Sequence, residues 1–448
     1  MSDRLSREKT SGGRSDRLAG EEPAAAFPLL TVLALMAGIF AVGSEELVVS
    51  PLLVDMAESF DTTVAVMALS VSTYGIGTAV GALLFAPLGD RGSRRLSLAT
   101  GMAAFVLGTV LCAFAAGPGL FFTGRALAGL ATGAFVPTAY AFVGDQISYR
   151  HRAKAMGIVV SSWSISLVLG VPMGSFLGQW ASWRWTFGLL SILGVLVTCG
   201  LLRAGRESRP AADEVSLSSQ DAPVTAAPAQ GWLRSAARAF LAPRVPVYVL
   251  ATFLNMLGFY GMYTYLGSAL QFRFGSTSSM TGVMILLYGL GFSTSFVTGR
   301  WADERGKERV LVALLAGLVP ALVLIPFVVR WTALLVLCLF LWGAMQSLVV
   351  TLLSTLLSES SPSHRGTILA FYSLATNLAV ALGAALLGPL FTAYGFSAVG
   401  WVCAVVTLVA FALSLWAHRR GGGRVPSRDG GPEHALNSGN SSVVGSPQ

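Results

Sequence analysis

The sequence predicts an all-α membrane protein with twelve transmembrane helices, arranged as two pseudo-symmetric six-helix bundles. Three observations support this prediction. Hydrophobic residues make up 54% of the 448 residues and charged residues only 12%, against roughly 25% charged in an average soluble domain. Apolar stretches repeatedly reach the roughly 20 residues that a helix needs to cross a bilayer. A charged loop also occurs twice, at corresponding places in the two halves of the chain, as in a duplicated membrane protein.

The duplication is visible in two landmarks separated by the same interval. Asp90 lies in the first charged loop and Asp303 in the second, 213 residues later (303 minus 90). Arg152 and Arg365, each of which follows a histidine, are also 213 residues apart (365 minus 152). Because two independent landmarks agree, we expect the second half to be a copy of the first.

Twelve stretches are long and apolar enough to form the predicted helices. They lie at residues 27–50, 64–88, 96–116, 120–144, 153–178, 186–203, 245–268, 279–301, 309–329, 332–357, 365–391 and 395–417. The chain then divides into a cytoplasmic tail, a first bundle, a cytoplasmic interdomain linker, a second bundle and a second tail, at residues 1–26, 27–203, 204–243, 244–417 and 418–448. The second tail is rich in Gly, Ser and Pro, so we expect it to be disordered.

The basic residues indicate the orientation of the chain. All but four of the 30 Lys and Arg residues fall in the tails and in the loops that follow even-numbered helices, whereas the first loop on the other side carries Asp55, Glu58 and Asp61 and no basic residue. By the positive-inside rule, we expect a multi-pass protein of the cell membrane with both termini in the cytoplasm. The net charge of +8 therefore requires no nucleic-acid partner. The four cysteines lie in apolar stretches without paired spacing, so we expect neither a disulfide nor a metal site.

The first repeated loop contains Asp90, Arg91, Arg94 and Arg95. With this loop the chain resembles the major facilitator superfamily and, within it, the twelve-helix drug:proton antiporters of the bacterial chloramphenicol, sugar and multidrug efflux type. The loop motif of that family is roughly Gly-x-Leu-Ala-Asp-Arg-x-Gly-Arg-Lys, and this chain has Ala86 and Ser93 where glycine is usual. The resemblance covers about residues 27–417 and implies the fold of that superfamily.

The loop is expected to act as a gate. Asp90 is placed to accept hydrogen bonds at the positive N-terminal end of the eleventh helix, and Arg94 is placed to pair with Asp145 at the end of the fourth. Such contacts would form only when the cytoplasmic side is closed, and would stabilise one state of a transport cycle. The alternative is that the charges only anchor loops to the membrane surface. Because Lys307 stands at the position of Arg94 in the second copy, we expect gating to belong mainly to the first half.

Only two acidic residues lie clearly inside a predicted helix, Glu45 and Glu46 in the first. A carboxylate at bilayer depth is costly unless it faces a cavity, finds a partner or takes up a proton, so both are candidates for proton coupling. The surrounding segment resembles the Gly-Thr-x-Glu-Phe stretch of bacterial drug and sugar efflux proteins, in a register that places Glu46 at the family's glutamate. Neighbouring residues point about 100° apart on a helix, so we expect only one to face the central cavity, and we favour Glu46. The alternative is that both are hydrated near the outer interface.

Two further features lie in the fourth and fifth helices. Arg125 lies deep in a predicted helix and resembles the fourth-helix Arg-x-x-x-Gly motif of the family. It would hold substrate or bias the protonation of a glutamate, or else donate to backbone carbonyls of neighbouring helices. Gly170, Pro172 and Gly174 resemble the antiporter motif of the family, in which glycine allows close helix packing and proline allows a bend. This pattern favours antiport over symport.

Candidates for a substrate surface are aromatic and amide residues, mostly in the second half. They are Tyr74, Asn255, Tyr260, Tyr263, Trp342, Gln346, Tyr372 and Asn377. Such side chains suit a flat, amphipathic molecule, although packing against lipid or other helices explains each of them equally well.

The sequence therefore predicts a proton-driven exporter of amphipathic small molecules, such as antibiotics or secondary metabolites, that works by alternating access. The alternative is a proton-coupled nutrient or sugar symporter or efflux permease of the same fold. The sequence has no nucleophile paired with a base and no nucleotide-binding loop, so we expect neither an enzyme nor direct ATP drive. We expect a monomer without cofactors, whose partners are its small-molecule substrate, protons and the lipid bilayer.

Overall fold

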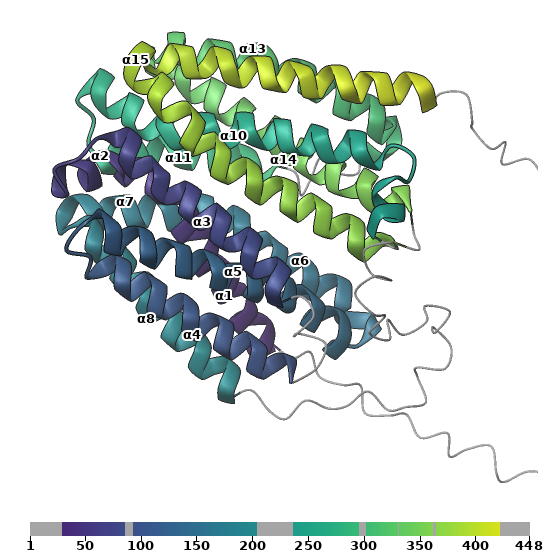
Figure 1. Ribbon diagram of the computed structural model, residues 1–448, viewed down its shortest axis with the longest axis horizontal. Coiled ribbons are helices and arrows are strands. Elements are labelled where there is room, and N and C mark those ends of the chain that lie inside the picture. Colours follow the sequence, from purple (N-terminus) through teal and green to yellow (C-terminus); the bar gives the residue numbers. More distant parts are fainter. Residues whose placement is uncertain are drawn as a thin grey trace, which may run out of the picture.

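The computed structural model describes residues 29–85, 93–203, 236–294, 302–329, 331–361 and 364–421. These residues are almost entirely helical and contain no strand. Figure 1 shows two helical bundles lying side by side, one from each half of the chain. Within the described residues, ten helices are long and apolar enough to cross a membrane. The predicted all-α membrane fold is therefore confirmed.

The first bundle contains six passes. Its elements are α1 (Leu29–Leu47), α2 (Val49–Ser59), α3 (Val64–Phe85), α4 (Arg94–Ala113), α5 (Pro118–Gln146), α6 (Tyr149–Ile165), the π-helix η1 (Ser166–Gly170), α7 (Val171–Trp180) and α8 (Trp183–Arg203). The first pass consists of α1 and α2, and the fifth consists of α6, η1 and α7.

The second bundle is built from fewer but longer elements. They are α10 (Val245–Phe274), α11 (Ser278–Ser293), α13 (Lys307–Val328), α14 (Thr332–Ser360) and α15 (Arg365–Gly421). The chain turns back within α15 at Gly395, whose φ of 75° lies in a region that favours glycine. The two arms of α15 correspond to the last two predicted passes, and α11, with 16 residues, is shorter than the rest. The described helices thus accommodate the twelve predicted passes.

The first pass is longer than the sequence predicts. The prediction ended it at residue 50 and placed Asp55 and Glu58 in a loop, whereas both lie on α2, which continues to Ser59. The proline within this segment, Pro51, falls in the first turn of α2, where proline is tolerated. The first pass therefore continues past this proline as a second helix, although α1 itself ends at Leu47.

The two bundles meet mainly along three of the described helices of the second bundle, α15, α11 and α10. α3 packs against α15, η1 and α7 pack against α11, and α2 packs against α10. The last pair approaches especially closely, because a Cβ atom on Gly267 of α10 would lie 2.2 Å from the carbonyl oxygen of Ser50. We refer to the contact of α1 and α2 with α10 as the seam.

Hydrogen bonds fasten the bundles together at the end of the molecule where α2 finishes. Gln271 donates to the carbonyl oxygen of Pro51 (2.7 Å), and Ser278 donates to the carboxylate of Asp55. We call this the Asp55 end (left in Figure 1) and the opposite one, where α4 begins, the Arg94 end. The structure is therefore closed between the bundles at the Asp55 end.

Candidate functional site

Glu45 and Glu46 lie near the middle of the first pass, which runs from residue 29 to residue 59. Their depth argues against the alternative that both are hydrated near an interface. The two side chains diverge, as helical neighbours must. Glu45 is fully buried in the first bundle, whereas Glu46 points toward α10 of the second.

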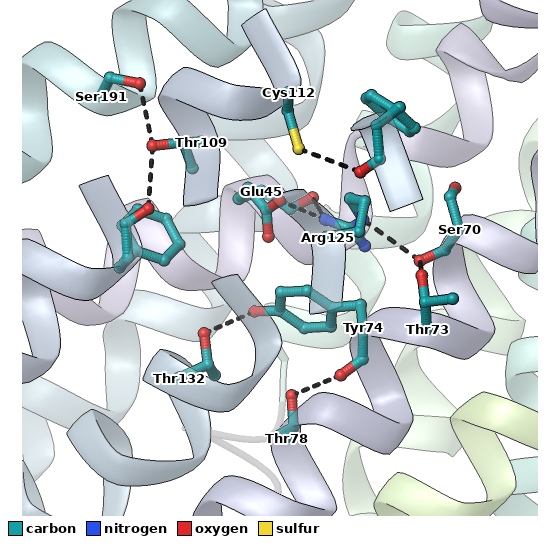
Figure 2. A network of polar contacts seen from close by, with 12 residues as sticks. Glu45, Ser70, Thr73, Tyr74, Thr78, Thr109, Cys112, Arg125, Thr132 and Ser191 are labelled. Carbon is teal, nitrogen blue, oxygen red and sulfur yellow. Dashed lines mark hydrogen bonds and ion pairs between the residues drawn. The ribbon is translucent and has the colours of Figure 1, made fainter. Parts of the chain in front are cut away.

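Glu45 forms a buried ion pair with Arg125 of α5 (Figure 2). Arg125 Nη1 donates to the Glu45 carboxylate and to the Glu45 carbonyl oxygen (3.1 Å), and Nε donates to the carbonyl oxygen of Ser70 (3.3 Å). The guanidinium lies over the ring of Tyr74, 4.2 Å from its centroid, and the Tyr74 hydroxyl is bonded to Thr132 (2.8 Å). Arg125 thus contacts a glutamate and also donates to backbone carbonyls of two neighbouring helices. Its effect on the protonation of a glutamate and its contact with substrate stay predictions.

Glu46 lies at the seam between the bundles. Its carboxylate accepts a hydrogen bond from the hydroxyl of Tyr260 on α10 (2.7 Å). Three residues further along α10, the hydroxyl of Tyr263 donates to the carbonyl oxygen of Leu47 (3.1 Å), and the carbonyl oxygen of Tyr263 accepts from Ser50 (2.5 Å). The acid favoured for proton coupling is therefore in direct contact with the second bundle.

Part of the charged loop can be placed. Asp90 and Arg91 lie outside the described residues. Arg94 pairs with Asp145 (2.7 Å), as the sequence predicts, and Arg95 donates to a backbone carbonyl of α8. Because α4 and α5 are neighbours in one bundle, the pair between Arg94 and Asp145 does not by itself join the two bundles. Its role in gating stays a prediction.

The second bundle contains an equivalent ion pair. Lys307 lies 213 residues after Arg94 (307 minus 94) and pairs with Glu359 at the end of α14, while Asp303 is 3.8 Å from Lys307. In each bundle, the pair joins the start of the third pass to the end of the fourth. Sequence reasoning missed Glu359, although it lies within one position of the 213-residue repeat of Asp145. The two loops are therefore more alike than the sequence suggests.

The glycines of the fifth pass pack against the first pass. A Cβ atom on Gly170 would lie 1.9 Å from Ser44 Oγ, and one on Gly174 would lie 2.6 Å from Val48 Cγ2. Pro172 follows η1 and lies in the first turn of α7. These residues hold the fifth pass close against the pass that carries the two embedded acids.

We expect Gly170→Ala to lower the stability of the folded protein, because overpacking typically costs about 1–3 kcal/mol. Gly157→Ala in the same pass is the matched control, since a Cβ atom there meets no atom within 4 Å. Thermal unfolding of the purified variants in one detergent measures the effect. Equal melting temperatures for the two variants would contradict this packing.

The candidates for a substrate surface fall into separate groups. Tyr74 belongs to the cluster around Arg125, and Tyr260 and Tyr263 lie at the seam. Tyr372 and Asn377 are half-buried on the first arm of α15.

The remaining candidates, Asn255, Trp342 and Gln346, are buried in the second bundle. The side-chain nitrogen of each forms no hydrogen bond within the described part of the chain. Trp342 packs against Tyr288 of α11 and Phe259 of α10, with ring centroids 4.7 Å and 5.7 Å away. Sequence reasoning missed Tyr288, whose only signal is an aromatic ring with a hydroxyl among aliphatic residues and glycines. The group combines closely packed aromatic rings with donors that form no hydrogen bond within the described residues.

Comparison with known proteins relates this chain to membrane transporters. The chain is 50% identical over 396 residues to the MFS-type transporter YwfA of Bacillus subtilis (strain 168), an alignment that covers 88% of this chain and 94% of the relative. It is 28% identical over 400 residues to a chloramphenicol resistance protein of Streptomyces lividans, covering 85% of this chain and 95% of that protein.

Solved transporters share the fold. The nucleoside transporter NupG matches with a TM-score of 0.69 at 13% identity, covering 88% of this chain and 99% of NupG. A D-xylose-proton symporter matches with a TM-score of 0.69 at 16% identity, covering 86% of this chain and 97% of the symporter. The family description Major Facilitator Superfamily matches residues 34–329 and 248–447. The chain therefore belongs to the major facilitator superfamily.

Proposed function

We propose that this protein is a proton-coupled exporter of amphipathic small molecules that works by alternating access between its two bundles. The observation that carries the proposal is the pair of adjacent carboxylates at the middle of the first pass, which have different partners. Glu45 forms an ion pair with Arg125, whereas Glu46 accepts a hydrogen bond from a tyrosine hydroxyl. A proton-driven transporter needs an embedded group that gains and loses a proton, and Glu46 fits this role better because, unlike Glu45, it forms no ion pair within the described residues.

The substrate class follows from the second bundle. Within the described residues, the buried side-chain nitrogens of Asn255, Trp342 and Gln346 have no hydrogen-bond partner, and the Trp342 ring packs against Tyr288 and Phe259. Rings and a few donors suit a flat molecule that carries acceptor groups. The chloramphenicol resistance protein of Streptomyces lividans supports an antibiotic or a related compound as substrate. We propose a monomer driven by the proton gradient, without ATP or cofactors, that transports its substrate and does not catalyse a reaction on it.

The distribution of basic residues supports an orientation with both termini and the Arg94 end in the cytoplasm of a bacterial cell membrane. The Asp55 end would then face outward. In this orientation, the hydrogen bonds at the Asp55 end correspond to a state that is closed to the outside.

Symport is the rival function within the same fold, because the D-xylose-proton symporter has the same architecture. The close packing of Gly170 and Gly174 against the first pass favours antiport, since this motif resembles that of antiporters. The direction of transport decides between the two.

Inverted membrane vesicles from a host without its own efflux pumps test the direction. We expect chloramphenicol or other members of a broad panel of amphipathic compounds to accumulate in vesicles that contain the protein and an acidic interior. A protonophore should abolish this accumulation, and vesicles without the protein serve as the control. Accumulation that survives the protonophore would contradict proton coupling, and gradient-driven uptake into intact cells would indicate symport.

A further inference from the structure

We propose that Tyr260 is the residue through which the second bundle senses the charge of Glu46, so that the seam stays closed while Glu46 is ionised. The inference rests on the proposed function, in which Glu46 exchanges protons. It gives Tyr260 a positioning role in proton coupling, where the sequence suggested only a substrate contact.

The geometry of the contact supports a response to charge. The Tyr260 hydroxyl on α10 lies 2.7 Å from the Glu46 carboxylate on α1, so the bond crosses from one bundle to the other. This distance fits a hydroxyl that donates to either an ionised or a neutral carboxyl group, but the bond to an ionised carboxylate is about twice as strong as its neutral counterpart. Protonation of Glu46 would leave only the weaker, neutral bond across the seam.

The backbone around the contact holds Tyr260 in place. In a continuous helix, the N–H of residue 51 would bond to the carbonyl oxygen of Leu47, but Pro51 has no N–H. The Tyr263 hydroxyl donates to this carbonyl (3.1 Å), and Ser50 donates to the carbonyl oxygen of Tyr263 (2.5 Å). Residues 260 and 263 are less than one helical turn apart, so these bonds set the position of the Tyr260 hydroxyl over Glu46. They involve no group that ionises near neutral pH.

The other charged or titratable groups near the contact come from five elements. They are Glu45 of α1, Tyr74 of α3, Arg125 of α5, Tyr263 of α10 and Tyr288 of α11. Glu45 and Arg125 form an ion pair with no net charge, and tyrosines are neutral near pH 7. Glu46 is therefore the group whose charge changes at this contact.

This arrangement would prevent wasteful cycling. An antiporter must not switch between its inward-facing and outward-facing states while it carries neither substrate nor proton. Such a switch would let substrate flow back down its own gradient without using the proton gradient. With Glu46 ionised and no substrate bound, the charge-assisted bond keeps the Asp55 end closed. Protonation weakens the bond, and a substrate that contacts either side chain would compete with it.

Spin-label distances measured at several pH values test the proposal. Labels are placed on cysteines introduced at Trp180 of α7 and Met280 of α11, which are 85% and 45% exposed and lie on different bundles. The four native cysteines are replaced, and the full-length protein is measured in lipid nanodiscs between about pH 4 and about pH 9, a range that includes the ordinary pKa values of glutamate and histidine. Four proteins are compared: the labelled parent, Glu46→Gln, Tyr260→Phe and Tyr263→Phe.

We expect the distance between the two labels in the parent to shift from short values, which mark a closed seam, to longer values as the pH falls. Glu46→Gln should lose this response. Tyr260→Phe should also lose the response, with a smaller closed population at alkaline pH. Tyr263→Phe removes a seam bond of similar geometry that ends on a backbone carbonyl, so it should reduce the closed population at every pH and keep the response.

A parental pH response in Tyr260→Phe, together with its loss in Glu46→Gln, would overturn the role of Tyr260 and leave the proposed function standing. If the parent and Glu46→Gln were equally insensitive to pH, both the inference and the choice of Glu46 as the proton site would be wrong. Loss of the response in Tyr263→Phe as well would show that the seam acts through packing and not through charge, and would also overturn the inference.

Discussion

Replacing Arg125 by methionine is expected to lower the free energy of unfolding by about 3–5 kcal/mol, the usual cost of removing one partner from a buried ion pair. Both side chains of the pair are fully buried, so water cannot compensate the Glu45 carboxylate that remains. Arg125 also donates to the carbonyl oxygen of Ser70, and a hydrogen bond that involves a charged group is worth about 1.5–3 kcal/mol. Thermal and chemical unfolding in one detergent would measure the loss.

The double variant Glu45→Gln with Arg125→Met separates these contributions. Removing both charges should restore most of the lost stability, because an uncompensated carboxylate costs more than a missing pair. The bonds from Arg125 to backbone carbonyls stay lost, so recovery should be incomplete. A double variant as unstable as Arg125→Met alone would show that Arg125 acts mainly by joining helices.

Hydropathy and charge in the sequence predict the passes and the duplication well, because membrane insertion depends on these same properties. The contact of Arg94 with Asp145 was also predictable, since both lie at ends of neighbouring helices. The extension of the first pass was not, because Asp55 and Glu58 look like loop residues. On α2, Asp55 is stabilised by Ser278 of the other bundle, which no local pattern reveals.

The partners of the two embedded acids were also beyond the sequence. Adjacent positions show that Glu45 and Glu46 must diverge, but which one meets Arg125 depends on the rotation of α1 against α5. The contact of Tyr260 with Glu46 spans 214 residues and depends on how the bundles pack. Tertiary packing determines which residues become partners in these contacts, and the spacing of residues along the chain does not reveal them.

Glu46→Gln is expected to cause a near-complete loss of proton-driven substrate accumulation while substrate exchange without a gradient continues. Glutamine has nearly the same shape, and its carbonyl oxygen can still accept a hydrogen bond from Tyr260, so the seam can close. It cannot bind and release a proton, so movement of substrate would no longer be tied to the proton gradient. Purified protein in liposomes allows both measurements: accumulation under an imposed pH gradient, and exchange of labelled for unlabelled substrate at equal pH.

Glu45→Gln is the matched control, because it changes the adjacent residue in the same way. It removes the charge partner of Arg125, so we expect a less stable protein, but the molecules that remain folded should still couple transport to protons. Normalising transport to the amount of folded protein separates the two effects. If Glu45→Gln abolished coupling and Glu46→Gln preserved it, the proton would be carried by the pair of Glu45 with Arg125. The contact between Glu46 and Tyr260 would then hold the bundles together without responding to the proton gradient.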